Sequence, residues 1–203
     1  MKMDHLTYAS EEIKTMEDKY KDSAIRFYEK PDKYELWFMN EFVEPVEAGT
    51  VNADLCNAII DLMHSNIDKE LHIFIWSIGG STRTLSTILQ LIRRFKKTVA
   101  ISLGTVHSCG WDLFFSCDER YATKHSSFMF HDTSVEIARR DIKSALAYAE
   151  CVKREMNAML GNDGREYLTD EEKKSAETGD IWLTGDDIIK RGGCKDFSLY
   201  MKN

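Results

Sequence analysis

Apolar residues along most of the chain follow two alternating patterns. Short, nearly continuous apolar runs are typical of strands buried on both faces of a sheet, and such runs lie at residues 71–76, 98–103 and 127–130. Elsewhere apolar residues recur every three or four positions, as they do over residues 55–63 and 85–95, and this spacing predicts amphipathic helices. The alternation of strands with helices predicts an α/β fold in which right-handed crossovers join parallel strands.

Further segments complete this outline. Residues 34–39 have the pattern of a strand, residues 110–117 that of a largely apolar helix, and residues 142–160 that of the longest amphipathic helix. Glycine and serine between the buried runs predict turns at residues 77–81 and 104–108. The second of these turns leads directly into the apolar helix.

The start of the chain differs in composition from the rest. It is rich in Glu, Lys, Asp and Tyr, and Pro31 ends a helical pattern that begins at Ser10. We therefore divide the chain into an N-terminal extension or docking arm, residues 1–34, and a single α/β domain, residues 35–203.

Composition narrows the class of protein. The 203 residues include 34 acidic and 27 basic side chains, a net charge of −7 that argues against nucleic acid as the main partner. No apolar run reaches the roughly 18 residues needed to cross a membrane, and we do not expect the polar N-terminus to be a secretory signal. Five cysteines without a CxxC pair predict neither a disulfide framework nor a zinc site. We expect a cytoplasmic protein without a metal or organic cofactor.

Two candidate sites for chemistry follow buried strands. The paired glycines Gly79 and Gly80 would let main-chain N–H groups approach a ligand closely, although a plain turn needs glycine too. Ser108 lies between a strand and a helix, where N–H groups favour developing negative charge. A serine there is also a common helix cap, so both interpretations stay open.

Two further candidates complete an ordered series. His131 ends an apolar strand and could act as a general base near neutral pH, or serve as a structural histidine. Asp180 precedes a strand, where aspartate is often a turn residue. None of these signals is specific alone. Their order along the chain, with each residue at the end of a strand or in a turn, is what indicates a site.

In this order the motifs resemble those of the ClpP family, the proteolytic subunits of the Clp proteases, within the ClpP/crotonase fold. The family's S-P-G-G-x turn is similar to residues 77–81, and its A-A-S-M-G-A stretch is similar to residues 106–111. Its M-I-H-Q-P strand end resembles residues 129–133, and its D-x-F-x-S-A-x-E-A segment resembles the stretch that opens at Asp180. The resemblance covers residues 35–197.

The resemblance implies an α/β fold of repeated ββα units with a long protruding handle helix. It implies a serine endopeptidase that cleaves unfolded polypeptides or short peptides inside a homo-oligomeric ring, a heptamer, with an AAA+ unfoldase as a possible partner. The implied catalytic triad is Ser108, His131 and Asp180. The implied oxyanion hole is formed by the backbone N–H groups of Gly80 and Cys109. The implied substrate-binding residues are Ile78, Gly79, Ser81, Asp132, Thr133 and Ser134.

The chain departs from the family pattern at several positions. Ile78 replaces the family's proline, and residues 132–137 lack the usual glycines. Gly179 stands where an arginine commonly takes part in ring–ring pairing, so a single ring and a double ring are both open. Residues 1–34 do not resemble the segment that receives the unfoldase. Two alternative functions stay open: a catalytically silent ring subunit, and a crotonase-type acyl-CoA enzyme.

Overall fold

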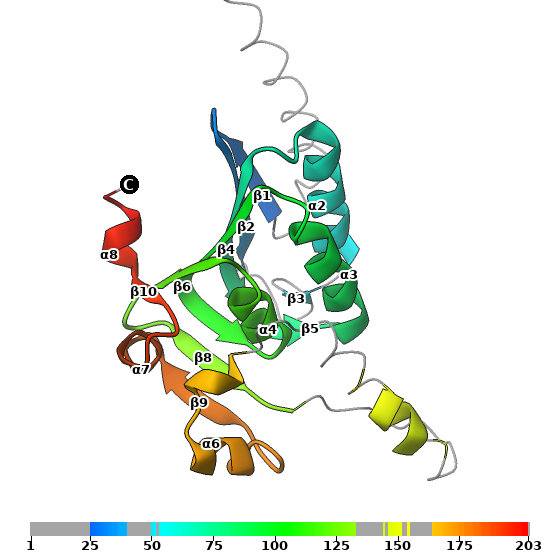
Figure 1. Ribbon diagram of the computed structural model, residues 1–203, viewed down its shortest axis with the longest axis vertical. Coiled ribbons are helices and arrows are strands. Elements are labelled where there is room, and N and C mark those ends of the chain that lie inside the picture. The colour runs from blue at the N-terminus through cyan, green and yellow to red at the C-terminus, as the bar shows by residue number, and fades with distance from the viewer. Residues whose placement is uncertain are drawn as a thin grey trace, which may run out of the picture.

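A mixed sheet forms the centre of the molecule (Figure 1). The computed structural model describes residues 25–39, 50–51, 53–132, 144, 146–151, 154 and 164–202. Within these residues eight strands run in the order β1-β2-β4-β6-β7-β10, with β8 paired to β6 and β9 paired to β8. The strands are β1 Ile25–Glu29, β2 Lys33–Met39, β4 Glu70–Ser77, β6 Lys97–His107, β7 Glu119–Ala122, β8 Ser127–Phe130, β9 Ile181–Thr184 and β10 Lys195–Asp196.

Helices and a second small sheet surround this centre. The small sheet pairs β3, Thr50–Val51, with β5, Gly79–Gly80, in parallel. The helices are α2 Ala53–Ser65, α3 Thr82–Ile92, α4 Cys109–Phe115, the 3₁₀ helix η1 Arg165–Tyr167, α6 Asp170–Ser175, α7 Gly185–Lys190 and α8 Phe197–Tyr200. β4, β5 and α3 follow one another as a ββα unit. The α/β fold predicted from the sequence is confirmed.

The two faces of the sheet bury different side chains. Alternate residues of a strand point to opposite faces, and along β4 Ile73 and Ile75 pack in the main core with residues of α2, α3 and α4. Phe74 belongs to a smaller aromatic cluster on the other face, where it stacks on Trp37 at 4.1 Å and meets Tyr200 of α8 edge-on. Figure 1 shows α2 and α3 together on one side of the sheet and α8 on the other. The apolar run predicted as a buried strand at residues 71–76 is therefore covered on both faces, whereas in β8 only Phe128 and Phe130 are buried.

β6 is longer than the sequence predicts. Residues 104–108 were expected to turn the chain, yet Gly104 to His107 continue the strand. The reason is a change of partner: the first half of β6 pairs with β7, and Thr105–His107 pair in parallel with Ser127–Met129 of β8. The prediction of a turn at 104–107 is wrong. This second pairing brings the end of β6 beside the end of β8.

Local sequence signals explain how the C-terminal helices begin. α6 and α7 each start with a capping box, in which Thr169 pairs with Glu172 and Thr184 pairs with Asp187. Each threonine side chain accepts from the main chain three residues on, and the acidic side chain accepts from the threonine N–H, which satisfies two helix-end donors. These two short helices flank β9 in the chain.

The N-terminal division and the long helix are only partly described. β1 pairs antiparallel with β2, and its Ile25 and Phe27 are buried in the main core, so residues 25–34 belong to the central sheet. The helix expected from Ser10 lies outside the described residues, and the division at residue 34 stays a prediction. In the segment 142–160, the described residues 144, 146–151 and 154 are helical. Among the helices described, none has both the length and the apolar character needed to cross a membrane.

Candidate active site

Ser108 occupies a strained position between β6 and α4. Its backbone has φ 53° and ψ −123°, and it is the one non-glycine residue of the described chain with a positive φ. Such a conformation costs about 1–3 kcal/mol and persists only where neighbours impose it. Its N–H donates to the carbonyl of Met129 at 2.9 Å. Ser108 is the N-cap residue of α4 by position, but its side chain makes no helix-capping hydrogen bond.

Ser108 and His131 are hydrogen-bonded to each other. The pairing of β6 with β8 places His107 opposite Met129, so the residues that follow these strands meet at one edge of the sheet. The Oγ of Ser108 lies 2.7 Å from Nε2 of His131, and Nδ1 of His131 lies 2.9 Å from the carbonyl oxygen of Asp132. A carbonyl only accepts, so Nδ1 must carry the proton. Nε2 is then the acceptor for the serine hydroxyl, as a general base requires.

Asp180 precedes the strand that pairs with β8, and it makes no hydrogen bond to Ser108 or His131. β8 and β9 are antiparallel, and their last pair is Phe130 with Ile181. The residues just beyond this pair are His131, which follows β8, and Asp180, which precedes β9. These two residues therefore lie opposite each other. The Asp180 side chain is exposed, and within the described part of the chain it makes no hydrogen bond or ion pair. The structure thus brings together two of the three expected triad residues and places the third at the neighbouring strand end.

The glycine pair lies directly against the serine. Gly79 and Gly80 have φ values of 112° and 146°, which L side chains rarely adopt. A Cβ atom on Gly79 would lie 2.6 Å from the Cβ atom of Ser108. The N–H of Gly79 donates to Oγ of Ser77 at 3.1 Å. This hydrogen bond ties the glycine loop to the last residue of β4. Only glycine allows the main chain to approach the serine this closely.

Cys109 is buried beside the serine, and its thiol is not a nucleophile. Burial raises the pKa of the Cys109 thiol to about 12, so the reactive thiolate is absent at neutral pH. The Sγ atom donates to the carbonyl oxygen of Gly80 at 3.3 Å. The side chain therefore joins the two residues whose N–H groups were expected to form the oxyanion hole.

His107 has a different environment from His131. Its Nε2 lies 2.9 Å from Oγ of Ser127, and its ring meets Trp182 edge-on at 4.8 Å. Burial lowers the pKa of His107 below its ordinary value. This second serine–histidine pair is held within the sheet by strands β6, β8 and β9, and we interpret it as structural.

The expected substrate-binding residues divide into three groups. Ile78 is 53% exposed beside the glycines, and Oγ of Ser81 caps α3 by accepting from the N–H of Thr84 at 3.3 Å. Asp132 forms an ion pair with Arg165 at 3.0 Å. Thr133 and Ser134 lie outside the described residues.

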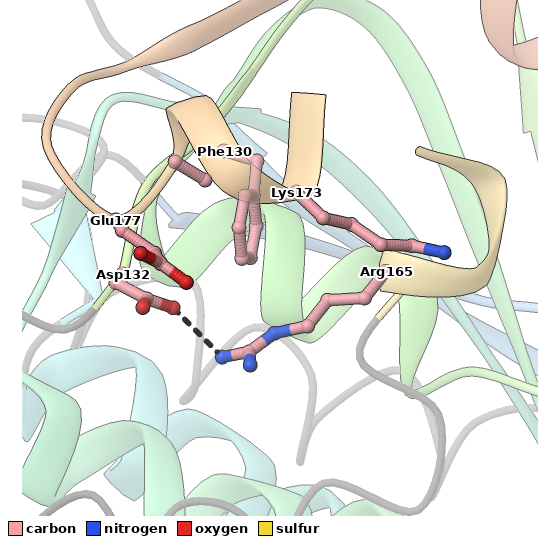
Figure 2. Close-up of a pocket in the computed structure, with 6 residues that line it drawn as sticks. Phe130, Asp132, Arg165, Lys173 and Glu177 are labelled. Carbon is pink, nitrogen blue, oxygen red and sulfur yellow. Dashed lines mark hydrogen bonds and ion pairs between the residues drawn. The ribbon is translucent and has the colours of Figure 1, made fainter. Parts of the chain in front are cut away.

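A cavity of about 510 Å³ opens next to His131. Figure 2 shows its lining residues, which come from β8 and from the segment between the long helix and β9: Phe130, Asp132, Arg165, Lys173, Ala176 and Glu177. Sequence reasoning missed Arg165. No motif surrounds it, and 33 residues separate it from its partner Asp132, so no local signal could have found it. Among the described residues, no group of three His, Cys, Asp or Glu side chains is arranged to hold a metal.

The fold and the site together define an α/β protein with a serine–histidine pair at the ends of neighbouring parallel strands. The family model for Clp protease matches residues 39–193 of the chain. The chain therefore belongs to the Clp protease family, whose members are peptidases that generally form oligomeric rings. A search of curated proteins finds no match to the chain.

Proposed function

We propose that the protein is a serine endopeptidase in which Ser108 is the nucleophile and His131 is the general base. The observation that carries this proposal is the 2.7 Å hydrogen bond between Oγ of Ser108 and Nε2 of His131. The hydrogen bond from Nδ1 to a carbonyl fixes the tautomer that this chemistry needs. Membership of a peptidase family supports the same reaction.

The reaction follows from these two side chains. Nε2 of His131 takes the hydroxyl proton while Oγ of Ser108 adds to the carbonyl carbon of a peptide bond. The imidazolium then gives that proton to the leaving amine, and a water molecule hydrolyses the acyl-enzyme by the same route. The Asp132 carbonyl accepts from Nδ1–H throughout and stabilises the charged ring.

The backbone N–H groups of Gly80 and Cys109 are the proposed oxyanion hole. Cys109 follows Ser108 in the chain, Gly80 follows the glycine that lies against Ser108, and the Cys109 thiol donates to the Gly80 carbonyl. Removing one such donor typically costs about 3 kcal/mol of transition-state stabilisation. The close approach of the glycine loop to Ser108 supports this role, because a donor must lie near the atom that becomes negative.

Asp180 is the proposed third member of the triad. Its place opposite His131 at the start of β9 supports this, since directly opposed residues of an antiparallel pair have Cβ atoms about 5 Å apart. To act, its carboxylate must turn toward the Nδ1–H group of His131 and share that hydrogen with the Asp132 carbonyl. The triad is then complete in the catalytic state.

Substrate, assembly and location complete the proposal. An extended polypeptide would lie along residues 78–81 and 132–134 as an added strand, inside a heptameric ring. We also propose an AAA+ unfoldase that delivers the polypeptide. This partner is inferred from the family alone. All five cysteines lie in the described chain and none forms a disulfide, which supports a cytoplasmic location.

A fluorophosphonate tests the proposal directly. We expect intact mass to show one adduct on the wild-type protein and none on Ser108→Ala or His131→Gln. Ser127→Ala is the matched control, because Ser127 also hydrogen-bonds a histidine, at 2.9 Å, and this variant should label like the wild type. Cleavage of an unfolded polypeptide should follow the same order. A wild-type ring, shown by size, that neither labels nor cleaves would establish a silent subunit instead.

A further inference from the structure

Arg165 contacts both sequence neighbours of His131. Its Nη2 donates to Oδ1 of Asp132 at 3.0 Å, and its guanidinium lies over the ring of Phe130, 5.3 Å from the centroid. Figure 2 shows the arginine reaching across the cavity toward Asp132 beside the Phe130 ring. The residues before and after the proposed base are thus held by one side chain.

The turn that carries Arg165 is anchored to the helix that follows Ser108. Gly164 has φ 74°, and a Cβ atom there would lie 2.5 Å from the ring of Phe115 in α4. Tyr167 stacks on the same ring, with centroids 5.5 Å apart. Nη1 of Arg191 donates to the Tyr167 carbonyl at 3.0 Å. Arg165 therefore connects the end of β8 to the element that positions Ser108.

The main-chain carbonyl and the side-chain carboxylate of Asp132 have different partners. Its carbonyl accepts from Nδ1 of His131, while its carboxylate is engaged by Arg165. We propose that Arg165 is a positioning residue for His131: by holding Phe130 and Asp132, it keeps the Asp132 carbonyl at Nδ1 and leaves Nε2 as the acceptor facing Ser108. This inference deepens the proposed function, on which its catalytic meaning rests.

The competing explanation is an ion pair that only joins η1 to the sheet. Such a pair would contribute to stability and leave the histidine ring unchanged. The two explanations differ in the tautomer of His131, which nitrogen chemical shifts of the ring report directly. That measurement needs no catalytic activity.

The test compares Arg165→Gln, Arg165→Lys, Asp132→Ala and the double variant Arg165→Gln/Asp132→Ala. Lys173→Gln is the matched control. Lys173 lines the same cavity and the substitution removes one positive charge, as Arg165→Gln does, but the ion pair of Lys173 is with Asp170 and not with Asp132. ¹⁵N-labelled histidine is followed by NMR, and His131→Gln assigns the resonance. Fluorophosphonate labelling rates and melting temperatures are measured on the same samples.

We expect the Nδ1–H tautomer of His131 in the wild type and in Lys173→Gln, and a mixture of tautomers in Arg165→Gln. Labelling of Arg165→Gln should be slower by about tenfold to a hundredfold, as for a misplaced catalytic group. Arg165→Lys should recover part of both effects. In the Asp132→Ala background, removing Arg165 should have a smaller effect than in the wild type, because Arg165 then keeps only its contact with Phe130.

The outcomes separate the inference from the proposed function. A wild-type tautomer and labelling rate in Arg165→Gln, whatever its melting temperature, would overturn the inference alone. A mixed tautomer in Arg165→Gln with no labelling of the wild type would support the inference and contradict the proposed function. If Arg165→Gln does not fold, Arg165→Lys and Asp132→Ala decide: an unchanged tautomer in both overturns the inference.

Discussion

Gly79 and Ser108 are in such close contact that a Cβ atom on the glycine would lie 2.6 Å from the Cβ atom of the serine. Real Cβ atoms essentially never come this close. The serine is itself held at a positive φ, so neither residue can yield without moving the other. The loop with the proposed oxyanion donor and the proposed nucleophile therefore form one rigid unit.

Gly79→Ala should remove most of the activity of Ser108. The added methyl group displaces either the glycine loop or the serine side chain, and displacement of this size costs about a hundredfold or more in rate. Fluorophosphonate labelling measures the loss. Gly192→Ala is the control, because Gly192 also has a positive φ, 78°, but nothing lies within 4 Å of an added Cβ. It should lose stability and keep its labelling rate. Equal labelling of Gly79→Ala and the wild type would disprove the rigid contact.

Cys109 should resist alkylation although it adjoins the proposed nucleophile Ser108. Its thiol is buried and burial raises its pKa to about 12, whereas Cys151 is exposed. Iodoacetamide at neutral pH should modify Cys151 and leave Cys109 untouched until the protein is unfolded. Peptide mapping by mass spectrometry gives the result. Rapid modification of native Cys109 would mean that the serine loop opens in solution.

Asp180→Asn should slow peptide hydrolysis by at least about a hundredfold, since loss of the proposed triad acid would leave His131 without a charged acceptor. Asp186→Asn is a suitable control, because Asp186 lies in the first turn of α7 and forms an ion pair with Lys190 on the surface. It should hydrolyse peptides like the wild type. Wild-type rates in Asp180→Asn would show that the Asp132 carbonyl alone serves His131.

The ion pair of Glu172 and Arg191 should make stability depend on pH in acid. Hydrogen bonds from Arg191, at 2.7 and 3.1 Å, hold the pKa of Glu172 below its ordinary value of 4.5. A lowered folded-state pKa means that the contribution is complete above pH 4.5 and is lost as the pH falls through the folded-state value.

Melting temperatures of the wild type and Arg191→Gln test this sign. The wild type should be the more stable of the two at pH 7, and the gap should narrow steadily below pH 4.5. Lys174→Gln removes an exposed charge of α6 that has no carboxylate partner among the described residues, and it should show no such narrowing. A gap that widens in acid would contradict the assignment of the effect to Glu172.

Local pattern was sufficient for much of the fold. The apolar run at 127–130 has the same bounds as β8, and the helical spacing over 85–95 corresponds to α3, although the helix ends at Ile92. Strand and helix periodicities depend on neighbours within a few positions, which the sequence contains. The extension of β6 through His107 could not be found this way, because it depends on pairing with residues 22 positions further along.

The sequence by itself determined the α/β class, the family and the serine and histidine of the candidate site, because these follow from periodicity and from motifs in a fixed order. Tertiary structure alone decided which atoms meet. In the folded chain, Nδ1 of His131 donates to the carbonyl of Asp132, and Arg165 donates to the Asp132 carboxylate. The side chain of Asp180 is exposed at the neighbouring strand end. Such contacts depend on strand register and on packing between distant segments. The residues next to Arg165 in the sequence do not indicate that its partner is Asp132.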